Sequence, residues 1–327
     1  MALEKAGYAL PNNCRAGACG ECKVKVRAGN FDQGMVLDMA LSADERRQGF
    51  GLMCMAKPIS DELVIEWGTD DARPKLFPPR EDALFIVVDK HLCTPRVVEL
   101  RLRAVGPAMR YWPGQYVTVG DSEAGIPPRS YSIANAPRPD GEIVLHVARA
   151  EGGQTSAWVH ERLAVGASVK VSGPYGSFIG DPSVDTPVLC LAAGTGLAPI
   201  LALAEAALRR GFKNRVMLVV SARTRQDVYA TGMLAWWRAR HRNFDYRITL
   251  TREVADGFAH GRIDSVLPQL FGSLAKHSVF AAGSPAFVDA CVAAAKGLGA
   301  PDEMIHVEGF FAQQEALAPA AGRRLDA

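Results

Sequence analysis

The chain has 327 residues, which is too long for one ordinary domain and predicts two or three. Its 48% hydrophobic and 22% charged residues are typical of a folded globular protein, and a formal net charge of +2 gives no general attraction to nucleic acid. No apolar run approaches the ~18 residues of a membrane-spanning helix, and the first residues lack a secretion signal. We therefore expect a cytoplasmic protein that binds neither nucleic acid nor membrane, and whose cysteines stay reduced.

Four of the seven cysteines lie near the N-terminus. Cys14, Cys19 and Cys22 have the spacing C-x4-C-x2-C, and Cys54 follows after a polar stretch. This spacing is typical of plant-type ferredoxins, in which four thiolates hold a 2Fe–2S cluster. A zinc site is the alternative, but it usually needs two C-x2-C pairs and only one is present. The sequence therefore predicts that these four cysteines bind a 2Fe–2S cluster, with the glycines between them leaving the backbone free to surround it.

The other three cysteines are scattered along the chain. Cys93, Cys190 and Cys291 each lie in an apolar run. We expect them to be small buried hydrophobic residues rather than reactive thiols.

The segment from Tyr8 to Cys54 resembles the ferredoxin module of oxygenase reductases, which has a β-grasp fold. Such modules begin with a two-stranded hairpin, whereas only thirteen residues precede Cys14 here. Either the true start lies upstream, or the module is a truncated one that lacks an edge of its sheet. We expect this ferredoxin domain at residues 1–67. Residues 68–82, which carry three prolines among charges, are expected to be an interdomain linker.

A second domain is expected at residues 83–182, where short apolar runs alternate with turns. The expected strands cover residues 84–89, 97–103, 115–119, 142–149 and 168–172. Five or six short strands at such intervals predict a small antiparallel β-barrel.

Within this region Arg129, Ser130, Tyr131 and Ser132 resemble the R-x-Y-S motif of the ferredoxin reductase superfamily. An arginine can bind a pyrophosphate with two parallel hydrogen bonds, a tyrosine ring can stack on a flavin, and a serine hydroxyl can reach the flavin N5 edge. Alone, these four residues could belong to any strand. A P-G-Q-Y turn at residues 113–116 and a G-P-Y-G turn at 173–176 also match the superfamily, and together they predict flavin binding.

A glycine-rich turn follows, and a helix is expected over residues 155–163. Gly153, Gln154, Thr155 and Ser156 at its start would form an anion site for the flavin phosphates. With the arginine of R-x-Y-S, this offers more anion capacity than a monophosphate needs, so we expect FAD rather than FMN. His146 lies where the family lines the side of the flavin, and we include it among the expected contacts. Trp158 is read equally well as a packed aromatic residue.

The third domain is expected at residues 183–311, where buried strands alternate with helices. Strands are predicted at 188–193, 216–221, 246–251 and 278–282, and helices at 200–210 and 287–296. This pattern predicts an open parallel α/β sheet with its ligand crevice beyond the carboxyl ends of the strands.

Two glycine turns follow predicted strands of this sheet. The turn Gly194–Gly196, with Thr195 at its centre, resembles the G-T-G-x-A-P motif of ferredoxin reductases and would let a nicotinamide or pyrophosphate approach the backbone. Gly283 and Ser284 resemble the family's C-G-x-P, although Ala282 stands where many relatives carry cysteine. Hydride transfer needs no thiol there, so the substitution bears on local geometry rather than on activity.

The segment after the second strand of this sheet is where the adenosine ribose should bind. Asp227 would suit the ribose hydroxyls of NADH, whereas Arg223 and Arg225 would suit the extra phosphate of NADPH. We favour NADH, with NADPH as the alternative.

Near the end of the chain, Glu308 and Phe310 resemble the family's terminal strand, whose acid and aromatic residue approach the flavin. The alternative is an ordinary strand end with buried phenylalanines. Residues 312–327, rich in alanine and charge, are expected to be a flexible tail.

The order of ferredoxin, flavin barrel and nicotinamide domain is similar to the reductase components of Rieske-type aromatic-ring dioxygenases, such as the terephthalate and naphthalene systems. The resemblance implies a monomer that takes hydride from NADH onto FAD and passes single electrons through the cluster to a terminal oxygenase component or its Rieske domain. Two other readings stay open: a reductase for a soluble diiron monooxygenase or a deoxysugar dehydratase, and a redox-sensing iron–sulfur protein. The resemblance assigns hydride transfer to Tyr131, Ser132, Thr195 and Glu308.

Overall fold

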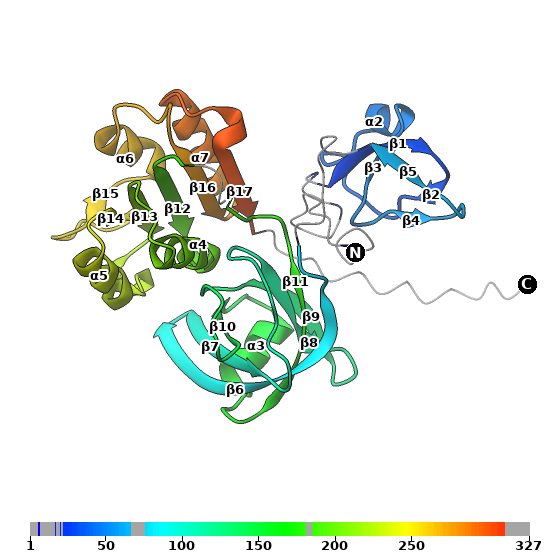
Figure 1. Cartoon of the computed structure of the whole chain (residues 1–327), viewed down its shortest axis with the longest axis horizontal. Helices are drawn as coiled ribbons and strands as arrows, with labels where there is room; N and C mark the ends of the chain where they lie inside the picture. Colours follow the sequence, from blue (N-terminus) through cyan, green and yellow to red (C-terminus); the bar gives the residue numbers. More distant parts are fainter. Residues whose placement is uncertain are drawn as a thin grey trace, which may run out of the picture.

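The computed structural model describes residues 22–66, 76–180 and 185–310, together with Ala6, Gly17 and Gly20. In these residues the strands form four sheets, which belong to the three expected kinds of domain (Figure 1). The expected tail and most of the expected linker lie outside the described residues, as do Cys14 and Cys19.

The N-terminal sheet is small and antiparallel, with the order β3-β1-β5. The short helix α2 begins with a capping box, in which Ser42 and Glu45 each satisfy the other's backbone N–H. The buried core of this N-terminal domain contains Val24, Leu41, Leu52 and Cys22. The elements are β1 (Lys23–Ala28), β2 (Phe31–Asp32), α2 (Ala43–Arg47), β3 (Phe50–Leu52), β4 (Lys57–Pro58) and β5 (Val64–Glu66).

The middle domain is the predicted antiparallel barrel, with strand order β10-β7-β6-β11-β8-β9. A bridge between Ile133 and Leu145 joins the two end strands and closes it. The elements are β6 (Arg80–Thr94), β7 (Val97–Ala104), β8 (Tyr116–Asp121), β9 (Ile126–Ser132), β10 (Glu142–Ala148), α3 (Gln154–Glu161) and β11 (Ser168–Tyr175).

Two features of this barrel differ from the sequence-based expectation. One strand, β9, lies outside the five expected ranges, and it carries the R-x-Y-S motif. The first strand, β6, has 15 residues rather than six and begins within the range 68–82 assigned to a linker. It is long because it pairs with β11 near its start and with β7 as far as Thr94, and this pairing satisfies its backbone although many of its side chains are exposed.

The C-terminal domain contains the predicted parallel sheet, in the order β15-β14-β13-β12-β16-β17. Its strands are β12 (Val188–Ala193), β13 (Val216–Ala222), β14 (Phe244–Leu250), β15 (Ala259–His260), β16 (Ser278–Gly283) and β17 (Ile305–Gly309). Its α-helices are α4 (Leu197–Arg209), α5 (Thr231–Arg240), α6 (Ile263–Leu270) and α7 (Pro285–Gly297), and its 3-10 turns are η1 (Gly194–Gly196), η2 (Arg225–Asp227) and η3 (Asp302–Met304).

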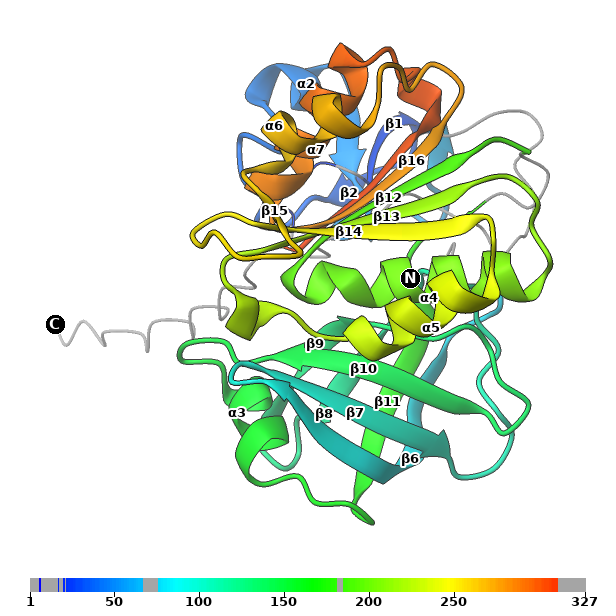
Figure 2. The same ribbon diagram turned by 90° about the vertical axis from the view of Figure 1, so that its left-hand side faces the viewer.

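Alternating side chains of this sheet serve two cores. Cys190 and Ala192 pack with α4 and α5, which lie between the sheet and the barrel, whereas Leu189 and Leu191 pack with α6 and α7 on the other face (Figure 2). This alternation explains why β12 is a continuous apolar run, since both of its faces are covered. The prediction that Cys190 and Cys291 are buried is confirmed, and burial raises the pKa of both thiols, whereas Cys93 is only half-buried.

The order of the strands places the ligand crevice. β12 and β16 are neighbours. The connections that follow them run on opposite faces of the sheet, through α4 after β12 and through α7 after β16. In open α/β sheets, ligands bind beyond the carboxyl ends of the strands at such a reversal. The turns that follow β12 and β16 are the two glycine turns predicted from sequence.

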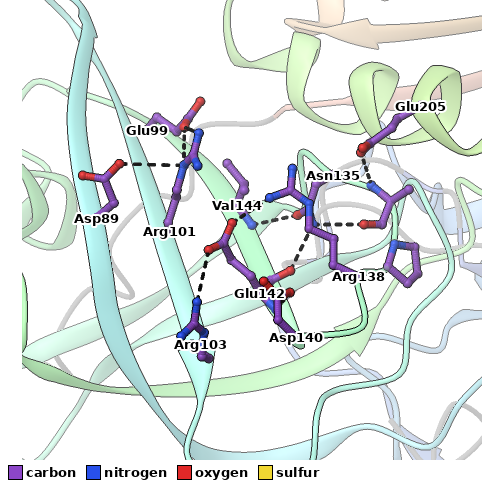
Figure 3. A network of polar contacts seen from close by, with 12 residues as sticks. Asp89, Glu99, Arg101, Arg103, Asn135, Arg138, Asp140, Glu142, Val144 and Glu205 are labelled. Atoms are coloured by element: carbon purple, nitrogen blue, oxygen red, sulfur yellow. Dashed lines mark hydrogen bonds and ion pairs between the residues drawn. The ribbon is translucent and has the colours of Figure 1, made fainter. Parts of the chain in front are cut away.

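Apolar and polar contacts join the barrel to the parallel sheet. Val97 and Phe178 of the barrel domain belong to the same buried core as α4. Figure 3 shows Glu205 reaching from α4 to the chain after β9, where its carboxylate accepts a hydrogen bond of 2.7 Å from the N–H of Ala136. The segment that follows R-x-Y-S is therefore anchored to the helix that follows the G-T-G turn.

None of the helices in the described residues is long and apolar enough to cross a membrane.

Candidate active site

Two of the four predicted cluster ligands lie within the described residues, and they are close together. Cys22 is buried just before β1, and its sulfur accepts a hydrogen bond of 3.4 Å from the N–H of Cys54. Backbone N–H groups directed at ligand sulfurs are typical of iron–sulfur sites. Gly17 and Gly20 have φ values of +68° and +80°, a conformation that other residues rarely adopt. The described part of this segment therefore fits a cluster.

Ser132 and Glu308 meet between the barrel and the parallel sheet, although they are 176 residues apart in sequence. Ser132 ends β9, and its hydroxyl donates a hydrogen bond of 3.4 Å to Oε2 of Glu308 in β17. Both side chains are buried, with 8% and 6% exposure. Burial raises the pKa of Glu308 to about 8, and the Ser132 hydroxyl opposes this in part. At neutral pH this carboxyl group therefore holds a proton.

The segment that follows Ser132 is fixed by a buried amide. The side chain of Asn135 donates to the carbonyls of Ala136 and Glu142, each at 3.0 Å, and accepts from the N–H of Val144 at 2.8 Å. Figure 3 shows Asn135 between β10 and the neighbouring turn. These bonds hold the end of β9 in one position, which places Ser132.

The G-T-G turn lies at the carboxyl end of β12. Gly194 has φ +56°, and a Cβ added there would meet no atom within 4 Å, so open space faces the turn. A Cβ at Gly196 would lie 2.1 Å from the carbonyl oxygen of Ala282. Only glycine therefore lets the ends of β12 and β16 approach this closely. Thr195, half-buried, lies between these two glycines.

The second glycine turn lies at the carboxyl end of β16. Ser284 precedes α7 as its N-cap residue, is exposed, and makes no side-chain capping bond. The N–H of Phe310 donates to the carbonyl of Gly283 at 2.7 Å, which ties the end of β17 to this turn. Glu308 stands opposite Ala282 in the strand register. The structure therefore brings Gly283, Ser284 and Glu308 to the same edge of the sheet as the G-T-G turn.

The side chains of R-x-Y-S differ in their surroundings. Within the described parts of the chain, no carboxylate lies in ion-pair distance of Arg129, whose guanidinium donates to the carbonyl of Pro128 at 3.0 Å. Tyr131 is half-buried against the barrel core, and burial raises its pKa to about 12, so the phenol stays neutral. Ser130 is half-buried opposite Thr118 of β8. An uncompensated guanidinium beside a neutral aromatic ring fits a flavin and its phosphates.

The hydroxyl groups at the start of α3 have partners within the fold. Thr155 is buried and donates to the carbonyl of Pro127, while Ser156 accepts from the N–H of Ala150 at 3.1 Å and donates to the carbonyl of Gly153 at 3.0 Å. Gly153 caps the helix without a side chain, and Gln154 beside it is exposed. Trp158 packs against the barrel core.

The segment after β13 is organised by two carboxylates. Oδ2 of Asp227 accepts from the N–H and hydroxyl of Thr224, at 3.1 and 3.0 Å, and so caps η2. Glu253, after β14, accepts from the Nε of Arg225 at 2.6 Å and from its N–H at 2.8 Å. Arg223 is exposed. Glu253 could not be predicted, because no local sequence pattern marks its pairing with Arg225. The capping role of Asp227 could have been predicted from the T-x-x-D spacing.

His146 of β10 is enclosed rather than exposed, with 5% exposure. Its ring lies edge-on to that of Tyr229, with 5.1 Å between the centroids. Tyr229 is a second residue that could not be predicted as part of the site, because no motif surrounds it in the sequence.

Comparison with known proteins agrees with this geometry. Three family models match in order: a 2Fe-2S iron-sulfur cluster binding domain at residues 1–58, an oxidoreductase FAD-binding domain at 85–179 and an oxidoreductase NAD-binding domain at 190–293. The reductase subunit of an aromatic O-demethylase from an Amycolatopsis species is 33% identical over 315 residues, which cover 94% of this chain and 92% of the relative. The chain belongs to the oxygenase-reductase family.

Other relatives of this reductase serve different oxygenases. The reductase component of phenol 2-monooxygenase from a Pseudomonas species is 33% identical over 89% of the chain and 83% of the relative. A reductase component of terephthalate 1,2-dioxygenase from a Comamonas species is 31% identical over 94% and 90%. The crystal structure of the Amycolatopsis cytochrome P450 reductase GcoB superposes with a TM-score of 0.87 at 31% identity, covering 94% of this chain and 92% of that one. The predicted fold class and the three cofactors, a 2Fe–2S cluster, FAD and NAD(P)H, are confirmed for this reductase.

Proposed function

We propose that this chain is the reductase component of an aromatic oxygenase system. It takes hydride from NADH at the edge of the parallel sheet and delivers single electrons to the oxygenase. The flavin supplies the chemistry that converts a two-electron donor into one-electron transfers, and the cluster carries those electrons onward. The cluster domain is part of the same chain, so the flavin-to-cluster step runs at high effective concentration.

The observation that carries the proposal is the buried contact between Ser132 and Glu308. It joins the strand that bears R-x-Y-S to the sheet edge that bears both glycine turns. A hydroxyl and a protonated carboxyl, both withdrawn from water, would offer hydrogen bonds and no negative charge to a flavin that gains negative charge when hydride arrives. We assign the phosphate-binding role to Arg129 and to the backbone N–H groups at the start of α3, because the Thr155 and Ser156 hydroxyls are used inside the fold.

The acceptor follows from chemistry shared by the relatives. They are named as reductases of a demethylase, a monooxygenase and a dioxygenase. We propose a terminal oxygenase component as the acceptor, with a Rieske-type dioxygenase as our first choice. A monooxygenase is the second candidate, which the phenol 2-monooxygenase relative favours. Reconstitution tests this: the purified chain with NADH should sustain product formation by one class of oxygenase. NADH oxidation that no one-electron acceptor accelerates would instead indicate a redox sensor.

We further propose that NADH is preferred because Glu253 neutralises Arg225. The carboxylate holds both the side chain and the backbone of this arginine and would repel the 2′-phosphate of NADPH. Glu253→Gln should therefore raise kcat/KM for NADPH relative to NADH by about 10-fold. The measurement is kcat/KM for both nucleotides, with Asp256→Asn, an exposed carboxylate on the same connection, as the matched control. A wild-type preference for NADPH that is lost in Arg225→Ala would contradict the proposal, and Asp227→Ser tests the same role for Asp227.

A further inference from the structure

A buried chain of polar side chains links the G-T-G turn to the barrel. The hydroxyl of Tyr229, which precedes α5, donates a hydrogen bond of 3.1 Å to the carbonyl of Gly194. The same hydroxyl lies 3.3 Å from Nδ1 of His146 in β10. Nε2 of His146 lies 3.6 Å from Oε2 of Glu99 in β7, and Glu99 also binds Arg101 at 2.8 Å. This series of polar contacts therefore runs from the G-T-G turn to the wall of the flavin barrel.

The direction of each contact follows from counting hydrogen-bond donors. A carbonyl can only accept, so the one proton of the Tyr229 hydroxyl goes to Gly194, and the hydroxyl oxygen accepts from Nδ1 of His146. The neighbouring His146 and Arg101 lower the pKa of Glu99 to about 2, so it is a carboxylate, and it faces Nε2 of His146 at 3.6 Å. Tyr229 therefore joins the ring of His146 to the carbonyl of Gly194.

The phenol keeps its proton throughout. Burial, with smaller effects of Cys93 and Glu99, raises the pKa of Tyr229 well above its usual value. Tyr229 is 8% exposed and the His146 side chain 2%, so water does not compete for these bonds. A satisfied polar chain in such surroundings is rigid.

Gly194 needs such a support. It is the first residue of the turn, it has φ +56°, and it has no side chain with which to fix itself. Its carbonyl accepts a hydrogen bond from the Tyr229 hydroxyl and another from the N–H of Leu197 within the turn. The position of the turn relative to the barrel therefore depends on one phenolic hydrogen bond and on the packing around it.

We propose that Tyr229 is a positioning residue: acting through Gly194, and held by His146 and Glu99, it sets the distance between the nicotinamide turn and the flavin barrel. The proposal rests on the proposed function, since it takes the G-T-G turn as the nicotinamide site. Hydride transfer is sensitive to small displacements, because the reacting atoms must lie within about 3.5 Å of each other. Loss of this bond should therefore slow the chemical step more than it weakens binding.

The test is Tyr229→Phe, which keeps the buried ring and removes only the hydroxyl. With the flavin-loaded protein and saturating NADH in a stopped-flow instrument, we expect flavin reduction to slow by about 10-fold or more, while the Kd for NADH changes by less than about 3-fold. Deuterium at the transferred position of NADH should slow the variant at least as much as it slows the wild type. Tyr246→Phe, on β14 two strands away from β12, is the matched control and should behave like the wild type.

The outcomes separate this inference from the proposed function. If NADH reduces the wild type and Tyr229→Phe at equal rates, the positioning role is wrong and the proposed function stands. A loss of NADH affinity that accounts for the whole defect, or an equal slowing in Tyr246→Phe, would also overturn the inference. If NADH does not reduce the wild-type flavin, the proposed function itself fails.

Discussion

At about pH 9, Glu308→Gln should reduce its bound flavin with NADH about 10-fold faster than the wild type, because an ionised Glu308 would oppose the negative charge that hydride brings to the flavin. The amide can still accept the hydrogen bond from Ser132, but it cannot ionise. In the wild type, burial raises the pKa of Glu308 to about 8, so the rate should be high below this value and fall as pH rises through it. In the variant that fall should be absent. The measurement is the stopped-flow rate constant from pH 6 to about 9 at saturating NADH.

Stability should respond to the same ionisation. The folded-state pKa of Glu308 lies above its ordinary value of 4.5, so the folded protein holds this proton more tightly than the unfolded chain. The buried carboxyl therefore costs stability above pH ~4.5, and the cost grows until the pH passes about 8. Glu308→Gln should unfold at a higher temperature than the wild type at pH 8 and at a similar temperature near pH 4.5.

Two serine variants complete this experiment. Ser132→Ala should slow flavin reduction at every pH, because it removes a buried hydroxyl that faces the carboxyl and would hydrogen-bond the flavin. Ser278→Ala removes a buried hydroxyl at the opposite, amino end of β16 and should leave the rate unchanged. Equal rates in Glu308→Gln and the wild type across the pH range would refute the role of this pair.

Cys22→Ala should abolish the iron–sulfur cluster and reduce electron delivery to the oxygenase to the background level, with flavin reduction by NADH retained. A plant-type cluster needs all four thiolates, and the flavin lies in a separate domain. The measurements are iron content, the electron paramagnetic resonance of the reduced protein, and oxygenase turnover. Cys291→Ala, a buried thiol in the parallel-sheet core, is the matched control and should keep about two irons per chain. Loss of flavin reduction in Cys22→Ala would mean that the domains do not act independently.

The sequence predicted those parts of the site whose chemistry is local. R-x-Y-S, the G-T-G turn and the cysteine spacing each fall within a few consecutive residues, so the residue types indicate the ligand. The parallel strands were also predictable, because two-sided burial makes β12 and β13 continuous apolar runs. The full length of β6 could not be predicted. Many of its side chains are exposed, and the start of the strand is fixed by pairing with β11.

The contacts that organise the site join residues far apart in sequence, and no local pattern predicts them. Glu253 meets Arg225 across 28 residues, and Tyr229 meets His146 across 83. Asp227 was predicted to bind the ribose, but its carboxylate also caps the turn that contains it. His146 was predicted beside the flavin, and the structure shows both of its ring nitrogens facing protein groups.

Electrons should pass from NADH through the flavin to the cluster within this one chain. The most direct test mixes the anaerobic, fully loaded protein with NADH and follows flavin absorbance together with the resonance of the reduced cluster after rapid freezing. We expect that the flavin is reduced first, that the cluster signal follows, and that Ser132→Ala delays both. A cluster that stays oxidised while the flavin is reduced, or one that is reduced at the wild-type rate in Ser132→Ala, would contradict this expectation.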